Sequence, residues 1–290
     1  MISTVIKSFR EYLMQVGYGT GTQEMLPRLV EEFLVQQRIK DIQMVEQEQV
    51  KAFYAYLQER PLKRRPGFLS EMMISHYVYA LKTFFSWLEV TEQADYNPIS
   101  GIRFRRAKKN SREPLSVEEV QELFKAAETL KETAILHLFY SLGLRRSEGG
   151  ELNTTDVKFK EQLLYVREGK GAKRRVVPMA EAVAKALERY YLNDRCNASV
   201  KRVKDESAFV LNATGGRMSG DGYNRVLKAV TERSGIGKEI TLHHLRHSIA
   251  THLLQGGMKL EQVRDFLGHA ALETTQIYAR THPSQLKLLL

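Results

Sequence analysis

Hydrophobic residues in the first hundred positions recur every three or four residues, which is the spacing of amphipathic helices. Glycine and proline interrupt this pattern, so it predicts four helices: residues 3–16, a second from Thr22, residues 45–57 and residues 68–90. The apolar side of the fourth contains Met72, Tyr77, Tyr79, Leu81, Phe84, Phe85, Trp87 and Leu88. Aromatic residues at helical spacing favour a buried core over a platform for stacking bases. We therefore expect a compact helical bundle without a catalytic constellation.

From Ser116 onward the pattern changes between helical and strand-like stretches. Ser116 and Glu119 have the spacing of a capping box, which starts a helix. Helical spacing is found over residues 117–127, 133–142, 180–192 and 222–234. Apolar or alternating runs are found at residues 157–160, 163–167, 175–177 and 208–211. The predicted fold class is mainly α with a small antiparallel β-sheet in this second part of the chain.

Another amphipathic helix is predicted to start at Leu242. His243 and Arg246 are three positions apart and should share its polar face. The apolar residues that should face a core are Leu245, Ile249, Leu253 and Leu254. After a break at Gly256-Gly257 we expect a short helix over residues 260–267, and then a turn at Gly268-His269 that leads to Tyr278.

The stretch between the two parts is strongly basic. Asn97-Pro98 cannot continue a helix, and residues 101–112 have the sequence GIRFRRAKKNSR, which contains no acidic residue. A solvated linker explains this composition, and so does a linker that contacts DNA phosphates, which we favour. We therefore expect an N-terminal helical domain at residues 1–98, a linker at 99–113 and a C-terminal domain at 114–290.

Charge is distributed unevenly along the chain. Residues 1–100 carry 11 Lys and Arg against 12 Asp and Glu, whereas residues 101–290 carry 33 against 22. A net charge of +11 in the second part indicates a polyanionic partner, most often nucleic acid. The single cysteine, Cys196, excludes an internal disulfide and a cysteine-based zinc site. There is no apolar run of membrane-spanning length and no signal peptide, so we expect no membrane association and a cytoplasmic location.

Several polar residues have the chemistry to hold and attack a phosphate. Arg145 could present a bidentate fork to a phosphate with Glu148 holding it, although an ordinary surface ion pair is the alternative. Lys170 lies between two glycines at a predicted turn, where it could reach a leaving oxygen. His243 and His247 have the spacing of a metal-binding pair, but no third ligand stands out, so we expect no metal site.

Four segments together resemble the successive sequence boxes of the tyrosine site-specific recombinases. They are GLRRSE (143–148), GKGAKRRVVP (169–178), HHLRHSIATHLL (243–254) and FLGHAALETTQIYA (266–279). They occur in that family's order and at its spacings, and the similarity covers residues 97–280. The N-terminal bundle resembles the family's core-DNA-binding (SAM-like) domain more weakly, in size and helical content. The chain is most similar to compact Xer-type recombinases and to phage or transposon integrases, which implies a two-domain clamp around DNA.

The resemblance implies a role for each matching residue. Tyr278 would attack a DNA phosphate, leaving a 3′-phosphotyrosine and a free 5′-hydroxyl. Arg145 and Arg246 would stabilise the charge that builds on the phosphate oxygens. Lys170 would be the general acid for the departing 5′-oxygen, His243 would assist proton transfer, and His269 would donate a hydrogen bond to the phosphate. No cofactor or metal ion is implied.

Further residues are candidates for contacts with the DNA backbone. These are Arg103, Arg105, Arg106, Lys108 and Lys109 in the linker, and Arg146 and Lys173 in the C-terminal part. One departure from the family's pattern is Gly149-Gly150, where an apolar residue is more common, and which we expect to loosen the start of a helix without affecting Arg145.

The expected function is site-specific recombination through a Holliday junction by a homotetramer on paired duplex sites. A type IB topoisomerase has related chemistry, but the distinct N-terminal bundle favours the recombinase. A DNA-binding protein without catalysis would have no use for the six candidate catalytic residues together, and a metal-dependent nuclease would need a carboxylate cluster. The resemblance leaves open a second recombinase or an accessory DNA-bending protein as a further partner. It also leaves open the target sequence and whether the reaction is integration, inversion or dimer resolution.

Overall fold

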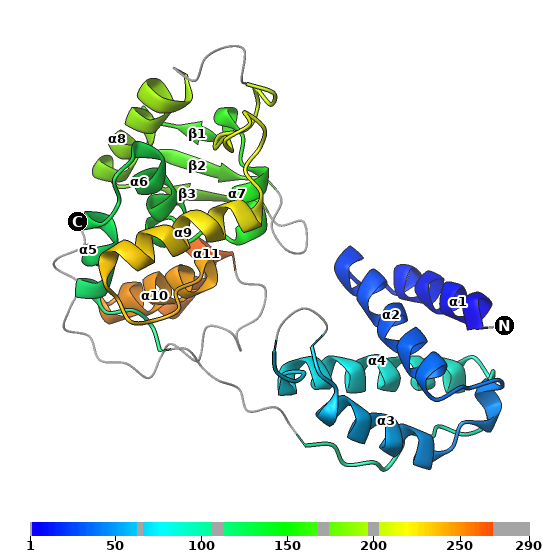
Figure 1. Ribbon diagram of the computed structural model, residues 1–290. Coiled ribbons are helices and arrows are strands. Elements are labelled where there is room, and N and C mark those ends of the chain that lie inside the picture. Colours follow the sequence, from blue (N-terminus) through cyan, green and yellow to red (C-terminus); the bar gives the residue numbers. More distant parts are fainter. Residues whose placement is uncertain (1, 63–65, 106–112, 168–173, 197–202, 269–290) are drawn as a thin grey trace. The chain divides into compact units, whose positions relative to one another are not determined.

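The computed structural model describes residues 2–62, 66–105, 113–167, 174–196 and 203–268. The chain divides into two compact units, Met1–Ser111 and Arg112–Leu290 (Figure 1). Both are mainly helical, and the described part of the second also contains a small three-stranded antiparallel sheet, so the predicted fold class is confirmed. Within the described ranges, no helix has the length and apolar character needed to cross a bilayer.

The N-terminal unit is the expected helical bundle. Its elements are α1 (Ile2–Gln15), α2 (Thr20–Gln36), the 3₁₀ turn η1 (Ile42–Met44), α3 (Gln47–Glu59) and α4 (Glu71–Val90). The Ser70 side chain caps α4 by accepting a hydrogen bond from the Met73 amide at 3.2 Å. Phe84 and Trp87 are buried as predicted, but Met72 and Tyr79 are 51% and 49% exposed and lie outside the core.

The first residues of the segment expected to be a linker belong to the N-terminal unit. Ile99 is buried in the core of this unit, and Ile102 and Phe104 pack against it. Arg103 and Arg105 alternate with these apolar residues and are exposed, with Arg105 3.9 Å from Glu71. An alternating pattern of this kind anchors the backbone on one side and presents guanidinium groups to solvent on the other.

The C-terminal unit begins with helices and then forms the sheet. Its first elements are α5 (Val117–Lys125), α6 (Leu130–Leu136), the π-helical turn η2 (His137–Ser141), α7 (Arg146–Glu151) and the 3₁₀ turn η3 (Thr154–Asp156). The Ser116 side chain caps α5 by accepting a hydrogen bond from the Glu119 amide, as the capping box predicts. The single helix predicted at residues 133–142 is thus α6 with a π-helical last turn.

The sheet has the order β1 (Val157–Lys158), β2 (Leu163–Val166), β3 (Arg175–Pro178). Leu164 pairs with Val157 on one side and Val177 on the other, and these three side chains are buried. Because strand residues alternate between faces, Arg175 lies on the same buried face as Val177, while Val176 is exposed. The strand predicted at 208–211 is wrong: Ala208 and Leu211 form isolated bridges instead.

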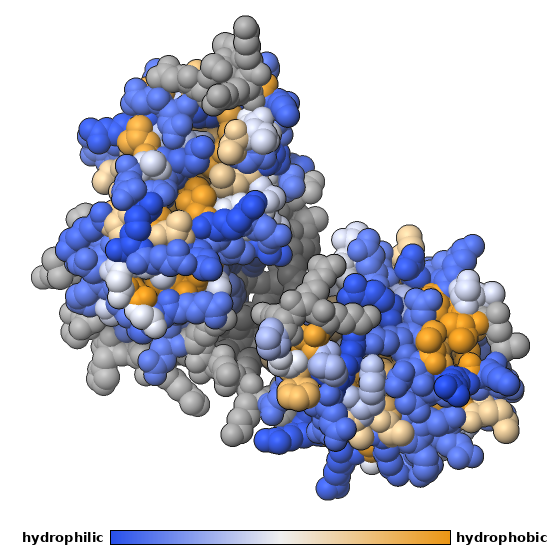
Figure 2. All heavy atoms as spheres, in the orientation of Figure 1, coloured by the Kyte–Doolittle hydropathy of each residue, from blue (hydrophilic) through white to orange (hydrophobic). Residues whose placement is uncertain are grey.

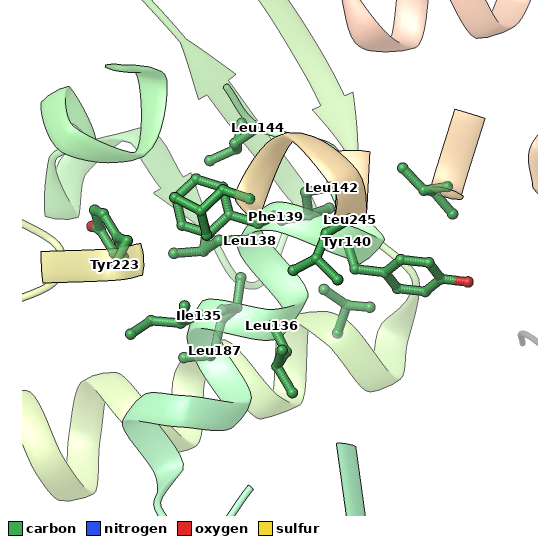
Figure 3. Packing of buried hydrophobic residues seen from close by; sticks show 14 of the residues in the cluster. Ile135, Leu136, Leu138, Phe139, Tyr140, Leu142, Leu144, Leu187, Tyr223 and Leu245 are labelled. Atoms are coloured by element: carbon green, nitrogen blue, oxygen red, sulfur yellow. The ribbon is translucent and has the colours of Figure 1, made fainter. Parts of the chain in front are cut away.

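The remaining helices complete the second core. They are α8 (Glu181–Tyr190) with the π-helical turn η4 (Tyr191–Arg195), α9 (Gly220–Ser234), α10 (Leu242–Gln255) and α11 (Leu260–Leu267). Their apolar faces meet around η2, where Phe139 stacks edge-on against Tyr223 of α9 at 4.9 Å and Tyr140 leaves the helix in another direction (Figure 3). The surface shown in Figure 2 is largely hydrophilic, with small separate hydrophobic patches on each unit.

Candidate active site

Arg145 lies immediately before α7, at a sharp change of chain direction. Gly143 has φ +57, a left-handed conformation that side-chain-bearing residues rarely adopt, and a Cβ there would lie 2.5 Å from Leu267 Cδ2. The turn lets the Arg145 amide donate to Glu148 Oε2 at 2.8 Å, while Arg145 Nη1 donates to Oε1 at 2.7 Å. Arg145 Nη2 donates to the Gly268 carbonyl at 2.6 Å. The Glu148 side chain is only 1% exposed, so this is not a surface ion pair.

Arg246 reaches the same place from α10. The Thr241 side chain caps this helix, and Leu245, Ile249 and Ala250 are buried in the core. The Arg246 side chain is 5% exposed and donates to the carbonyls of Gly143 and, at 2.6 Å, Leu267. Its Nη1 lies 3.9 Å from Glu148 Oε2. The fold therefore brings together the two arginines that the sequence predicts as the phosphate clamp.

A third guanidinium, which the sequence did not single out, completes this cluster. Arg175 of β3 donates from Nη1 and Nη2 to the two oxygens of Glu148, both at 2.8 Å, and from Nε to the Phe266 carbonyl at 3.0 Å. We refer to Arg145, Glu148, Arg175 and Arg246 as the arginine cluster. Strand alternation could have identified Arg175 from the sequence. Residues two apart in a strand lie on the same face, and Arg175 is two positions before the buried Val177.

The arginine cluster contains three positive charges and one negative charge. Burial alone would raise the pKa of Glu148, but the hydrogen bonds and charge of Arg175, together with the hydrogen bonds from Arg145, lower it to about 2. Glu148 is therefore ionised at neutral pH. The surplus of positive charge in a largely buried place favours an anionic ligand, and a guanidinium presents donors that match the oxygens of a phosphate.

His243 lies on the first turn of α10, where its side chain is exposed, three residues before Arg246. His247 follows one turn later and is partly buried; burial, followed by the nearby His243 and His244, lowers its pKa. In the ranges the structure describes, no three or more His, Cys, Asp or Glu side chains gather where they could hold a metal ion.

The other predicted site residues fall into two groups. Arg146 is exposed, pairs with Asp221 at 3.3 Å, and lines an open hollow of about 520 Å³ between α7 and the start of α9. Arg103 and Arg105 are exposed on the N-terminal unit. Predicted site residues outside the described ranges are Lys170, His269, Tyr278, Arg106, Lys108, Lys109 and Lys173. For these the structure leaves the sequence-based roles as predictions.

The chain is similar to known proteins both in sequence and in fold. A model of the phage integrase family matches residues 113–285. The tyrosine recombinase XerD of Listeria innocua is 33% identical over 226 residues, which cover 76% of this chain and 74% of the relative. The tyrosine recombinase XerC of Chlamydia trachomatis is 38% identical over 220 residues, covering 74% and 68%.

A solved structure shows the same fold over nearly the whole chain. It is the integrase of the Tn1549 transposon in complex with circular intermediate DNA, with a TM-score of 0.74, 20% identity and 97% coverage of each chain. The relatives favour neither a topoisomerase nor a DNA-binding protein without catalysis. With the family match spanning more than half of its length and the arginine cluster assembled in the matched part, the chain belongs to the phage integrase family of tyrosine site-specific recombinases, enzymes that cleave and rejoin DNA.

Proposed function

We propose that this recombinase cleaves its DNA site with Tyr278 as the nucleophile. The phenolic oxygen forms a bond to phosphorus, the bond between phosphorus and the 5′-oxygen breaks, and the products are a 3′-phosphotyrosine and a free 5′-hydroxyl. Attack by a 5′-hydroxyl of another strand reverses these bonds, so rejoining consumes no nucleotide cofactor. Exchange of one strand pair at a time then produces a Holliday junction.

The observation that carries this proposal is the meeting of Arg145 and Arg246 at one buried carboxylate. Donors held in place before the reaction stabilise developing charge without having to reorganise, which is the largest single contribution at many active sites. Tyrosine has a pKa of about 10 when free, so it needs cationic surroundings to act near neutral pH. The cluster supplies those cations from side chains.

Proton transfers are assigned to residues that flank the cluster. We assign His243 to assist removal of the proton from Tyr278, and Lys170 to protonate the departing 5′-oxygen. His269 would donate a hydrogen bond to the phosphate, and it directly follows Gly268, whose carbonyl accepts from Arg145. Without protonation of the leaving oxygen, cleavage would expel an alkoxide, so the general acid should have a large effect on the rate.

The proposed partner is a duplex recombination site. The N-terminal unit would be the core-DNA-binding domain, and the basic residues near its end and before Arg112 would contact phosphates. Paired sites require four active subunits, so we propose a homotetramer on DNA, with a second recombinase or a DNA-bending protein as the remaining possible partners. Since the similar recombinases come from bacteria, whose DNA lies in the cytoplasm, we also propose a cytoplasmic location.

A covalent trap tests the proposed nucleophile. Nicked duplexes from the regions flanking the gene would be incubated without divalent metal, using wild type, Tyr278→Phe and the control Tyr165→Phe, whose side chain is on the exposed face of β2. A denaturing gel should show a protein–DNA adduct for wild type and Tyr165→Phe only. An adduct with Tyr278→Phe, or DNA binding without any adduct on every duplex, would contradict the proposal.

A further inference from the structure

Arg175 has no assigned role in the expected chemistry, yet its charged side chain is buried and hydrogen-bonded in the C-terminal unit. It begins β3, directly after the segment that contains Lys170, and its side chain is 8% exposed. Burying a guanidinium is unfavourable unless it is paired and its donors are satisfied. The position therefore requires a set of specific acceptors, and the structure provides them.

All three guanidinium nitrogens of Arg175 donate a hydrogen bond. Nη1 and Nη2 form a parallel pair of hydrogen bonds with Glu148, both 2.8 Å long, and Nε donates to the Phe266 carbonyl at 3.0 Å. A planar guanidinium bound at three donors has a fixed position and orientation. Arg175 thus connects the inner face of β3 to α7 and to the last turn of α11.

Each arginine of the cluster binds a different carbonyl at the end of α11. Arg175 binds Phe266, Arg246 binds Leu267 and Arg145 binds Gly268. The last carbonyls of a helix have no partner within the helix and carry its negative dipole end, so cations there are stabilising. Gly268 has φ +67, and a Cβ on it would lie 3.0 Å from Arg175 Cδ, so the two pack closely.

Glu148 transmits the position of Arg175 to Arg145. Each Glu148 oxygen accepts one hydrogen bond from Arg175 and one from Arg145. With Arg175 removed, the carboxylate would lose half of these bonds and could rotate, and the guanidinium of Arg145 would move with it. The carbonyl end of α11 would lose one of its three cationic partners at the same time.

We propose that Arg175 is a positioning residue for DNA cleavage. Through Glu148 it sets the orientation of Arg145, and through Phe266 it sets the end of α11, from which the chain continues to His269 and Tyr278. This inference rests on the proposed function, since it assigns Arg145 and Tyr278 the roles given above. A lysine at the same position would keep the charge but could not form the fork to Glu148 and the bond to Phe266 together.

The test is single-turnover formation of the covalent adduct on a nicked duplex, measured as a function of DNA concentration. The variants are Arg175→Met, Arg175→Lys and the matched control Arg174→Met, which removes an exposed arginine from the neighbouring position. Misplacing reacting groups by about 1 Å costs roughly 10²-fold in rate, so the maximal rate with Arg175→Met should fall by about that factor. Arg175→Lys should be intermediate, and the half-saturating DNA concentration should change little for both.

The control separates positioning from a general loss of positive charge. Arg174→Met should retain the wild-type maximal rate, with any change confined to the half-saturating DNA concentration. Thermal denaturation of each variant checks folding. If Arg175→Met does not fold, the maximal rate of Arg175→Lys tests the inference instead. A wild-type maximal rate with a folded Arg175 variant, or a change in half-saturation alone, would overturn the inference. A wild-type protein that forms no adduct would overturn the proposed function first, and this inference with it.

Discussion

Glu148 is a single carboxylate on which two guanidinium groups are hydrogen-bonded and near which a third lies. Its folded-state pKa of about 2 is below its ordinary value of 4.5. The folded protein therefore binds fewer protons at this group than the unfolded chain between these pH values. By linkage, the stabilisation from ionised Glu148 is complete above pH 4.5 and is lost as the pH falls toward 2.

Glu148→Gln should strongly destabilise the C-terminal unit at neutral pH. Removing one partner of a buried ion pair leaves the other charges uncompensated, so we expect a loss of about 3–5 kcal/mol in the free energy of unfolding. The difference from wild type should shrink as the pH falls from 4.5 to 2. A urea titration monitored by hydrogen exchange of α10 peptides measures both the loss in the free energy of unfolding and its change with pH.

Two controls accompany this measurement. Glu151→Gln changes an exposed carboxylate of the same helix and should have little effect. The single tryptophan, Trp87, lies in the N-terminal unit, so its fluorescence should report an unchanged unfolding midpoint. A Glu148→Gln effect that does not vary between pH 7 and pH 3 would contradict the assignment of the charge.

At the scale of elements, the two glycines of α7 have different roles. The sequence predicts that Gly149-Gly150 loosens this helix. In the structure Gly149 is buried against Phe139 of η2, and a Cβ would lie 2.5 Å from the ring carbon Cζ. A Cβ on Gly150 would meet nothing within 4 Å. Gly149 therefore permits the close approach of α7 to η2, whereas Gly150 serves no packing purpose.

Alanine substitutions at these two neighbouring positions should have different effects on stability. Gly149→Ala should destabilise the C-terminal unit by about 1–3 kcal/mol, because overpacking displaces the Phe139 ring. Gly150→Ala should be neutral or stabilise it by up to about 1 kcal/mol, because alanine has the higher helix propensity. Thermal denaturation of the two variants side by side measures this. Equal shifts in the same direction would contradict the packing argument.

Another element-scale feature is a stripe of polar residues along α10 that holds the start of the C-terminal unit. Ser248 Oγ accepts from the Leu115 amide at 2.9 Å, and His252 Nε2 pairs with the Leu115 carbonyl at 2.8 Å. His244 Nε2 pairs with the Glu113 carbonyl at 2.5 Å. His244 and His252 are both buried, so their role here is structural. We refer to residues 101–112 as the basic segment. The chain that follows the basic segment is thereby bound to α10, the helix that carries Arg246.

Ser248→Ala should release this attachment. The buried Leu115 amide would lose its acceptor, at a cost of about 1–3 kcal/mol, and its hydrogen exchange should accelerate correspondingly. Ser248 also donates to the His244 carbonyl, four residues earlier, at 2.9 Å. Ser75→Ala is the matched control, since Ser75 donates to the Glu71 carbonyl four residues earlier, also at 2.9 Å, but in an exposed bond on α4. Unchanged exchange at Leu115 in Ser248→Ala would show that the serine does not hold the segment.

For the whole molecule, charge is the property most directly connected to function. The net charge of +11 over residues 101–290 contrasts with −1 over residues 1–100. Phosphate contacts release counterions from DNA, so the logarithm of the binding constant falls with the logarithm of salt concentration by about 0.9 per contact. The number of contacts made by the basic segment is therefore measurable.

Neutralising the basic segment should reduce the salt dependence of DNA binding. Replacing Arg103, Arg105, Arg106, Lys108 and Lys109 with glutamine should lower the slope by up to about 4–5. The control replaces five lysines that are in exposed ion pairs within their own helices: Lys7, Lys51, Lys125, Lys185 and Lys228. Fluorescence anisotropy at several salt concentrations gives both slopes. Equal slopes for the two variants would mean that the segment makes no special contribution.

Local sequence patterns are enough to predict the helical character of both units, the sheet and the family. These depend on local periodicity, on capping residues such as Ser116, and on short boxes in a fixed order, all of which are properties of neighbouring residues. Arg145 and Arg246 could be named for the same reason. The boundaries were less accurate: π-helical and 3₁₀ turns at His137–Ser141 and Ile42–Met44 depend on packing rather than on propensity.

How the arginines are held depends on contacts between elements that are distant in the sequence. Arg175 is a charged residue in a strand, and nothing in its immediate neighbours distinguishes it from Arg174 except the face on which it lies. Its acceptors, Glu148 and the Phe266 carbonyl, are far from it in the sequence and come together only when β3, α7 and α11 pack. The same holds for Gly149, where a side chain does not fit because the ring of Phe139 lies against it. The burial of Arg175 and the close packing of Gly149 against Phe139 both depend on long-range contacts, which a local sequence pattern cannot predict.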